Sequence, residues 1–180
     1  MNDTPARVWL TRTILVGLIV LSLQMTIATE IRPFGVVVQV MLAFTVAVGA
    51  ASGPGEGAKA GFVLGLMYDL ATGLPLGSTA MSMAFGGYVA GWGRQYRLEP
   101  TWWMLAALAG IGAAVGEVLV PVVRVLTGET GVFEARIAVI LPVVAISAGL
   151  LSPVFIPIAR WALVIRPTEI RVADADTRSV

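Results

Sequence analysis

The sequence predicts an all-α integral membrane protein, a bundle of six transmembrane helices with short loops and both termini in the cytoplasm. The first observation is composition: 57% of the residues are hydrophobic, 13% are charged and the mean hydropathy is +0.87. Such a chain has too little polar surface to cover a water-soluble globule. The second is length. Because one crossing takes about 20 residues, a chain of 180 residues holds five or six crossings and no separate soluble domain.

The apolar runs place six spans in a single transmembrane domain of residues 1–166, followed by a short cytoplasmic tail, 167–180. The spans are expected at about 8–28, 34–52, 56–72, 77–93, 101–126 and 133–163. The first run could be a signal peptide, but Ala28-Thr29-Glu30 lacks a small-x-small cleavage site and a second apolar run follows at once. We therefore expect a retained span.

Glycine and proline mark the ends of the following elements. Pro33 suits the start of the second helix, and Gly53-Pro54-Gly55 predicts its end and a turn. Residues 56–93 are apolar for too long to make one crossing, and Gly73-Leu74-Pro75-Leu76-Gly77 breaks them into a helical hairpin. The fifth helix has Pro121 near its end. A kink or tilt is expected in the sixth, which carries Pro142, Pro153 and Pro157.

Basic residues predict the orientation, because cytoplasmic loops are enriched in Lys and Arg. Six spans with both termini inside place nine basic residues on the cytoplasmic side. In the same arrangement all five tryptophans lie at the cytoplasmic ends of helices. The three basic residues outside are Arg32, Arg124 and Arg136. In a five-span alternative, with 56–93 as one broken crossing, Arg94, Arg97 and the arginines from Arg160 onward would move outside.

The missing residue types exclude several kinds of chemistry. Without Cys or His, the chain offers no thiolate nucleophile, imidazole base, Ser-His-Asp triad or usual zinc ligand set. The sequence contains no G-x-x-x-x-G-K-[ST] phosphate loop, and no paired carboxylates at close spacing suggest a general acid and base. A net charge of +1 provides no field for nucleic acid. We expect a binding subunit with no catalytic residue, cofactor or metal.

The most informative stretch of the chain carries small residues at helical spacing. Four glycines and one carboxylate follow one another four residues apart: Gly57, Gly61, Gly65, Asp69 and Gly73. The next predicted helix adds further small residues, among them Gly87 and Gly91. On a helix these positions form a stripe that lets another helix approach closely, either within the chain or from a partner. The sequence leaves both interpretations open.

Three charged residues near the outer ends of the spans have open roles. Asp69 could accept hydrogen bonds from backbone N–H groups between Ala71 and Leu76, contact a partner, or take part in ligand or proton chemistry. Glu117 and Arg124 share a helix face but lie two turns apart, too far for a direct salt bridge. Glu117 could instead pair with another Arg, meet a second protein, stay protonated, or lie unpartnered at the outer interface.

The segment GFVLGLMYDLATGLPLGSTAMSMAFGGYVAG, from Gly61 to Gly91, resembles the central signature of the MreD family of rod shape-determining membrane proteins. In that signature a Gly-spaced helix ends in Asp, and a Gly-x-Pro-x-Gly-like turn leads into a second Gly-rich helix. The family motif carries over to Gly61, Gly65, Asp69, Pro75 and Gly77. The resembling segment is about a sixth of the chain.

The resemblance implies a non-enzymatic subunit of the bacterial cell-elongation machinery in the cytoplasmic (inner) membrane. Its expected partner is an MreC-like bitopic membrane protein. Through that complex it would work with the MreB filament, the RodA-type glycosyltransferase and a class B penicillin-binding transpeptidase, and so support peptidoglycan synthesis and cell shape.

A different class of protein also fits the size, span number and small-residue faces: the six-helix substrate-binding subunits of energy-coupling-factor vitamin transporters. Such a subunit needs a polar pocket near the outer leaflet, for which the candidates are Asp69, Thr72, Ser78, Thr79, Glu117 and Arg124. A third class, an intramembrane protease, would use Asp69 with Glu117, but nothing in the spacing forces the two carboxylates together.

Overall fold

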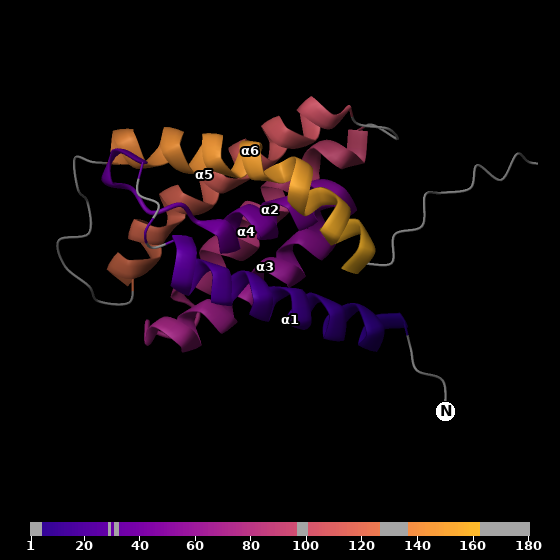
Figure 1. The fold of residues 1–180 in the computed structure, drawn as a ribbon, viewed down its shortest axis with the longest axis horizontal. Coiled ribbons are helices and arrows are strands. Elements are labelled where there is room, and N and C mark those ends of the chain that lie inside the picture. The colour runs from indigo at the N-terminus through magenta and orange to yellow at the C-terminus, as the bar shows by residue number, and fades with distance from the viewer. Residues whose placement is uncertain (1–4, 29, 31–32, 97–100, 127–136, 163–180) are drawn as a thin grey trace, which may run out of the picture.

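The computed structural model describes residues 5–28, 30, 33–96, 101–126 and 137–162, and within these ranges the chain forms six α-helices and no strand (Figure 1). The all-α class and the six helices are confirmed. The helices are α1 (Pro5–Leu23), α2 (Val40–Ser52), α3 (Pro54–Thr72), α4 (Ser78–Trp92), α5 (Trp102–Leu126) and α6 (Ile137–Ala162). Shorter elements are a π-helical turn, η1 (Gln24–Ala28), and two 3₁₀ turns, η2 (Pro33–Gly35) and η3 (Gly93–Tyr96).

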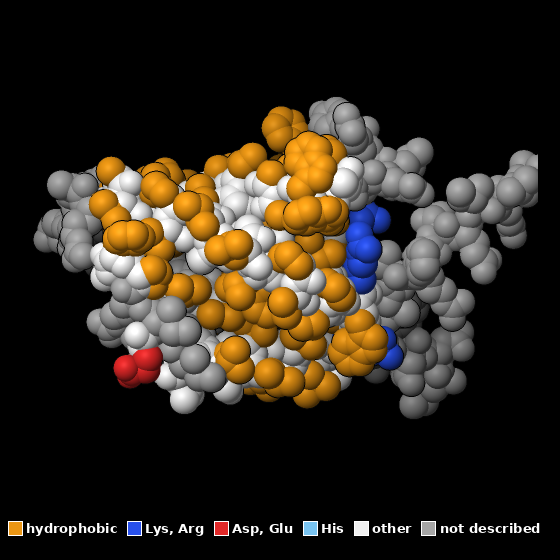
Figure 2. Space-filling model, turned by 45° about the horizontal axis from the view of Figure 1, so that its top comes forward, with side chains coloured by type: hydrophobic (Ala, Val, Ile, Leu, Met, Phe, Trp, Pro, Cys, Tyr) orange, Lys and Arg blue, Asp and Glu red, His pale blue; other side chains and the backbone are white. Residues whose placement is uncertain are grey.

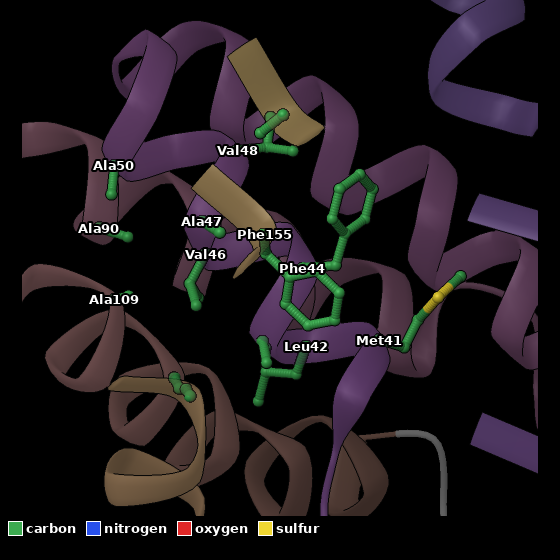
Figure 3. Packing of buried hydrophobic residues seen from close by; sticks show 14 of the residues in the cluster. Met41, Leu42, Phe44, Val46, Ala47, Val48, Ala50, Ala90, Ala109 and Phe155 are labelled. Atoms are coloured by element: carbon green, nitrogen blue, oxygen red, sulfur yellow. The ribbon is translucent and has the colours of Figure 1, made fainter. Parts of the chain in front are cut away.

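Helix α2 is the centre of the bundle. It contacts α3, α4, α5 and α6, and it is buried on every side from Val40 to Ala51. A helix that is hydrophobic all round is expected to be an interior helix. Figure 3 shows its large side chains among those of its neighbours. The Phe44 ring meets the Phe155 ring of α6 edge to face, with centroids 5.6 Å apart, a favoured aromatic geometry.

The second helix begins later than the sequence predicted. Its start was expected near Phe34, but Phe34 and Gly35 have positive φ angles of 54° and 78°, and residues 36–39 are not helical. The helix begins at Val40. Pro33 therefore begins the η2 turn and not the helix. Phe34 and Gly35, which follow it, have left-handed backbone conformations, and these cannot be part of a right-handed α-helix.

The link between α2 and α3 is shorter than predicted. Gly53-Pro54-Gly55 was expected to form a stop and a turn before a helix starting at 56. Gly53 alone separates the two helices, with a φ of 107°, and Pro54 is already in the first turn of α3. Proline suits this position because a helix leaves its first N–H groups without intrahelical partners.

The last four helices pack as sequential neighbours, α3 against α4, α4 against α5 and α5 against α6. Two helices are long and apolar enough to cross a membrane, α5 over Trp102–Val123 and α6 over Ile137–Ala162. Figure 1 shows α6 bending in its second half, drawn in yellow. Pro153 and Pro157 lie in that half, and each removes an intrahelical hydrogen bond.

The outer surface of the bundle is largely apolar. Figure 2 shows hydrophobic side chains covering most of the described face, with basic side chains at one end and acidic ones at the other. Large exposed hydrophobic residues occur on five of the helices, for example Ile19, Phe85, Ile111 and Leu150. Soluble monomers rarely expose such large apolar areas. The surface therefore favours a membrane as the surroundings of this chain.

Candidate functional site

Asp69 is fully buried near the end of α3, and its carboxylate binds the first turn of α4. Oδ2 accepts hydrogen bonds from the N–H groups of Gly77 at 2.9 Å and Ala80 at 3.4 Å. Oδ1 accepts from the Thr79 N–H at 3.1 Å and the Ser78 hydroxyl at 3.4 Å. One carboxylate thus takes four donors at a helix start.

This arrangement is a helix cap supplied from another helix. The N-cap residue of α4 is Gly77, which has no side chain with which to cap. The first N–H groups of a helix have no intrahelical partners, and the positive end of the helix dipole attracts a negative charge. Asp69 satisfies both needs, and it does so inside the bundle, where unpaired polar groups are costly.

The sequence correctly placed Asp69 at the hairpin tip but misplaced its donors. They were expected between Ala71 and Leu76, whereas the carboxylate binds groups from Gly77 to Ala80. Inside the turn it is the backbone oxygen of Asp69 that accepts, from the Gly73 and Leu74 N–H groups. The side chain reaches past the turn because the next helix start has the greater number of unsatisfied donors.

Gly73 and Gly77 shape the turn and do not belong to the packed stripe. Gly73 ends α3 in the left-handed conformation at φ 70°, and Gly77 precedes α4 at φ 96°. A Cβ atom at either position would meet no neighbouring atom, so their role is conformational. Between them, the Pro75 carbonyl accepts the Ser78 N–H at 3.1 Å. The expectation that Gly73 continues the packing stripe is therefore wrong.

The remaining glycines of the stripe hold α3 against α4 at backbone distance. A Cβ atom on Gly57, Gly61 or Gly65 would come within 3.0 Å of backbone atoms of α4. The approach is reciprocal, because a Cβ atom on Gly87 would meet the Gly57 carbonyl and one on Gly91 would meet Gly53 and Pro54. Of the two interpretations left open, packing within the chain is the one these contacts fit.

Glu117 of α5 lies beside the start of α2. Gln39 Nε2 donates a hydrogen bond to Glu117 Oε2 at 2.6 Å, and Glu117 has a further interaction. Sequence reasoning considered an Arg from another helix and missed this glutamine. The Arg124 side chain falls outside the described residues, so the expectation that it lies too far from Glu117 for a direct salt bridge stays a prediction.

Gln24 is a second residue that sequence reasoning missed. Its side chain is almost fully buried in the π-helical turn after α1. Gln24 Oε1 accepts from the Val40 N–H at 2.6 Å and the Met41 N–H at 3.3 Å, while Nε2 donates to the Val38 carbonyl at 3.2 Å. It thus caps α2 much as Asp69 caps α4. The available signal was an uncharged polar residue inside an apolar run.

The outer face of the hairpin carries an open apolar groove. It encloses about 440 Å³ between α3 and α4 and is lined by Ala58, Phe62, Met81, Ala84, Phe85 and Tyr88. Its walls are almost entirely hydrocarbon and include no carboxylate, Lys or Arg. The described residues contain no group of three or more His, Cys, Asp or Glu that could hold a metal ion. The four hydrogen bonds of the Asp69 carboxylate to the start of α4 are suited to holding α3 and α4 together.

Comparisons with protein-family models, with curated proteins and with solved structures returned no match to this chain.

Proposed function

We propose that this chain is a six-span protein of the bacterial cytoplasmic membrane that acts as a non-catalytic subunit of the cell-elongation complex and binds an MreC-like bitopic protein. The observation that carries the proposal is the Asp69-capped hairpin of α3 and α4. Each residue that carries the MreD resemblance has a structural role in this hairpin. Gly61 and Gly65 allow close approach, Asp69 forms the cap, and Pro75 and Gly77 lie in the turn.

Helix α3, and α2 together with the segment before it, are long enough to cross a membrane. Helix α3 has 19 residues, which span about 28 Å at 1.5 Å per residue, close to the hydrocarbon thickness of about 30 Å. Helix α2 has 13 residues and alone covers only about 20 Å. Residues 36–39 precede it in non-helical form and add about 13 Å if extended.

Non-helical backbone is tolerated at membrane depth only where protein or water satisfies it. Gln24 supplies that satisfaction, because it bonds the Val38 carbonyl and the Val40 N–H on either side of the helix start. This detail supports an α2 that crosses together with its preceding segment.

The distribution of charge supports an orientation with both termini inside. Arg12, Lys59, Arg94 and Arg160 lie on parts of α1, α3, η3 and α6 that the antiparallel order of helices brings to one end. Glu30, Asp69 and Glu117 belong to the opposite end. Figure 2 shows basic side chains at one end of the described face and acidic side-chain atoms at the other. The positive-inside rule assigns the arginine end to the cytoplasm.

A mild-detergent pull-down of tagged protein from its native cells tests this proposal. Recovery of an MreC-like bitopic protein together with cell-wall synthases is the expected result. Recovery of paired ATPases with a membrane coupling subunit would replace the proposal with vitamin uptake. A Phe62→Leu variant, altered only on the exposed outer face, is the matched control for a Gly61→Leu variant, which should lose the partner with the hairpin.

A further inference from the structure

Three arginines from three separate elements converge at the end of the bundle opposite Asp69. Arg12 belongs to α1, Arg94 to η3 after α4, and Arg160 to the last turn of α6. Arg12 and Arg94 are half-buried, and Arg160 is exposed. None of the three contributes to the capped hairpin or to the core. Their gathering needs an explanation of its own.

Arg12 is fixed in place by the residue next to Arg160. Its guanidinium lies over the Trp161 ring, 5.2 Å from the centroid, and Nη1 donates to the Trp161 carbonyl at 3.4 Å. Both contacts are of kinds that orient an arginine firmly, a cation–π contact and a hydrogen bond to a carbonyl near a helix C-terminus. The positive charge of Arg12 is therefore held beside the end of α6.

Arg94 and Arg160 are close enough to repel each other. Burial lowers the pKa of Arg94, and the neighbouring charge of Arg160 lowers that pKa further. Within the described parts of the chain, no carboxylate forms an ion pair with any of the three arginines; the ion pair found there joins Lys59 and Glu56 at 2.9 Å. Like charges held together without an anion are unfavourable. Among the described residues the cluster has no counter-charge.

We propose that Arg94 and Arg160, with Arg12 beside them, bind a phosphate group at the cytoplasmic end of the bundle. Guanidinium groups match phosphate oxygens bidentately. Basic sites between helices on the cytoplasmic side are suited to anionic lipid headgroups. The same chemistry would accept a soluble phosphate, so the source has to be determined by experiment.

The surroundings of the cluster lie at headgroup depth. Four tryptophans at this end of the bundle are more than half exposed: Trp92, Trp102, Trp103 and Trp161. Indole rings prefer the zone between hydrocarbon and water. An anion bound among these residues would therefore sit level with the lipid phosphates. This inference needs the chain to lie in a membrane, but it does not depend on the proposed partner.

The test compares purified full-length protein with an Arg94→Gln/Arg160→Gln variant and with Lys59→Gln, which removes a charge at the same end that already has Glu56 as its partner. Retention of phosphatidylglycerol and of phosphatidylcholine with matched chains is measured by native mass spectrometry. Melting in neutral detergent, with and without millimolar inorganic phosphate, forms the second arm. The melting temperature without phosphate also shows whether the variants fold. Removing the repulsion between Arg94 and Arg160 should not lower it.

The wild type should retain phosphatidylglycerol about 25-fold better than the double variant, since each of the two arginines near the surface contributes roughly fivefold to anionic-lipid binding. Lys59→Gln should change retention less than about twofold. A melting shift with inorganic phosphate that requires the arginines would assign the site to soluble phosphate instead. The proposal is overturned if neither ligand distinguishes the wild type from the double variant, or if Lys59→Gln loses as much. A recovered MreC-like partner alongside that result would leave the proposed function intact.

Discussion

Helix α2 and the α3–α4 hairpin are held in the same bundle by opposite means. Around α2 the contacts come mainly from large side chains such as Met41, Leu42 and Phe44, all almost fully buried, while Gly49 brings the α2 backbone against that of α4. Between α3 and α4 the contacts come from backbone atoms, because glycines remove the side chains. The comparison shows that the packing of α2 depends mainly on large side chains that fill the core. The packing of the hairpin depends on positions that have no side chain.

The two regions also begin their helices differently. The start of α2 is capped by the neutral Gln24 and the start of α4 by the charged Asp69. Each cap comes from a residue of the preceding helical segment, across a turn. A charged acceptor forms stronger hydrogen bonds than a neutral one. The two regions should therefore respond to different substitutions and with different magnitudes.

The largest effect is expected from shrinking a buried side chain of α2 itself. Phe44→Ala removes a ring that is completely buried and packed against Phe155. The free energy of unfolding should fall by about 3 to 4 kcal/mol, because the cavity would be only partly filled by relaxation. Equilibrium unfolding in mixed micelles measures this. Phe85→Ala on the exposed face is the control and should cost less than about 1 kcal/mol.

The second effect comes from enlarging a residue in the hairpin. Gly61→Leu would drive a side chain into the backbone of Met83 and Ala84, and the free energy of unfolding should fall by about 3 kcal/mol. Phe62→Leu, one residue away and exposed, should change it by less than about 0.5 kcal/mol. Equal stabilities of the two variants would contradict the backbone packing of α3 against α4.

The third effect comes from removing the charged cap. Asp69→Ala leaves the buried donors from Gly77 to Ala80 without their acceptor, and unfolding should become easier by about 2 to 3 kcal/mol. Asp69→Asn keeps one acceptor oxygen and should fall between Ala and wild type. Glu56→Ala, which loses an acid paired with an exposed Lys59, serves as the control, at about 0.5 kcal/mol or less. A melting temperature for Asp69→Ala equal to that of the control would remove the capping role.

The smallest effect is expected from the neutral cap. Gln24→Ala removes one acceptor from the first turn of α2 and one donor to Val38, which should cost about 1 kcal/mol. Ser22→Ala provides the control, because the Ser22 hydroxyl is exposed and bonds only its own helix at Leu18. If Gln24→Ala cost more than Asp69→Ala, the ranking of the two caps would be reversed.

Sequence reasoning predicted the hairpin better than the central helix, and the physical cause is local. The glycine spacing and the Gly73–Gly77 break are properties of neighbouring residues, so α4, expected at 77–93, is found at Ser78–Trp92. Likewise the carboxylate inside an apolar run already required partners near the turn. The sequence could not predict which groups donate to the Asp69 carboxylate, because this depends on how α3 and α4 pack against each other.

The start of α2 and the glutamine contacts could not be predicted in the same way. An apolar run gives no sign of where extended backbone becomes helix when both are buried. Gln24 meets Val40 only because the chain folds back at η2, and Gln39 meets Glu117 only through the packing of α5 on α2. Such contacts depend on tertiary structure, which one sequence does not show.

Hydrogen–deuterium exchange in the first turns of α2 and α4 tests the central claim most directly. The amides of Gly77–Ala80 and of Val40–Met41 are followed in the wild type, in Asp69→Ala and in Gln24→Ala. Asp69→Ala should speed exchange at 77–80 and leave 40–41 unchanged, and Gln24→Ala should do the reverse. Unchanged exchange at 77–80 in Asp69→Ala would show that this carboxylate does not cap α4, and would leave it free for a partner, a ligand or a proton.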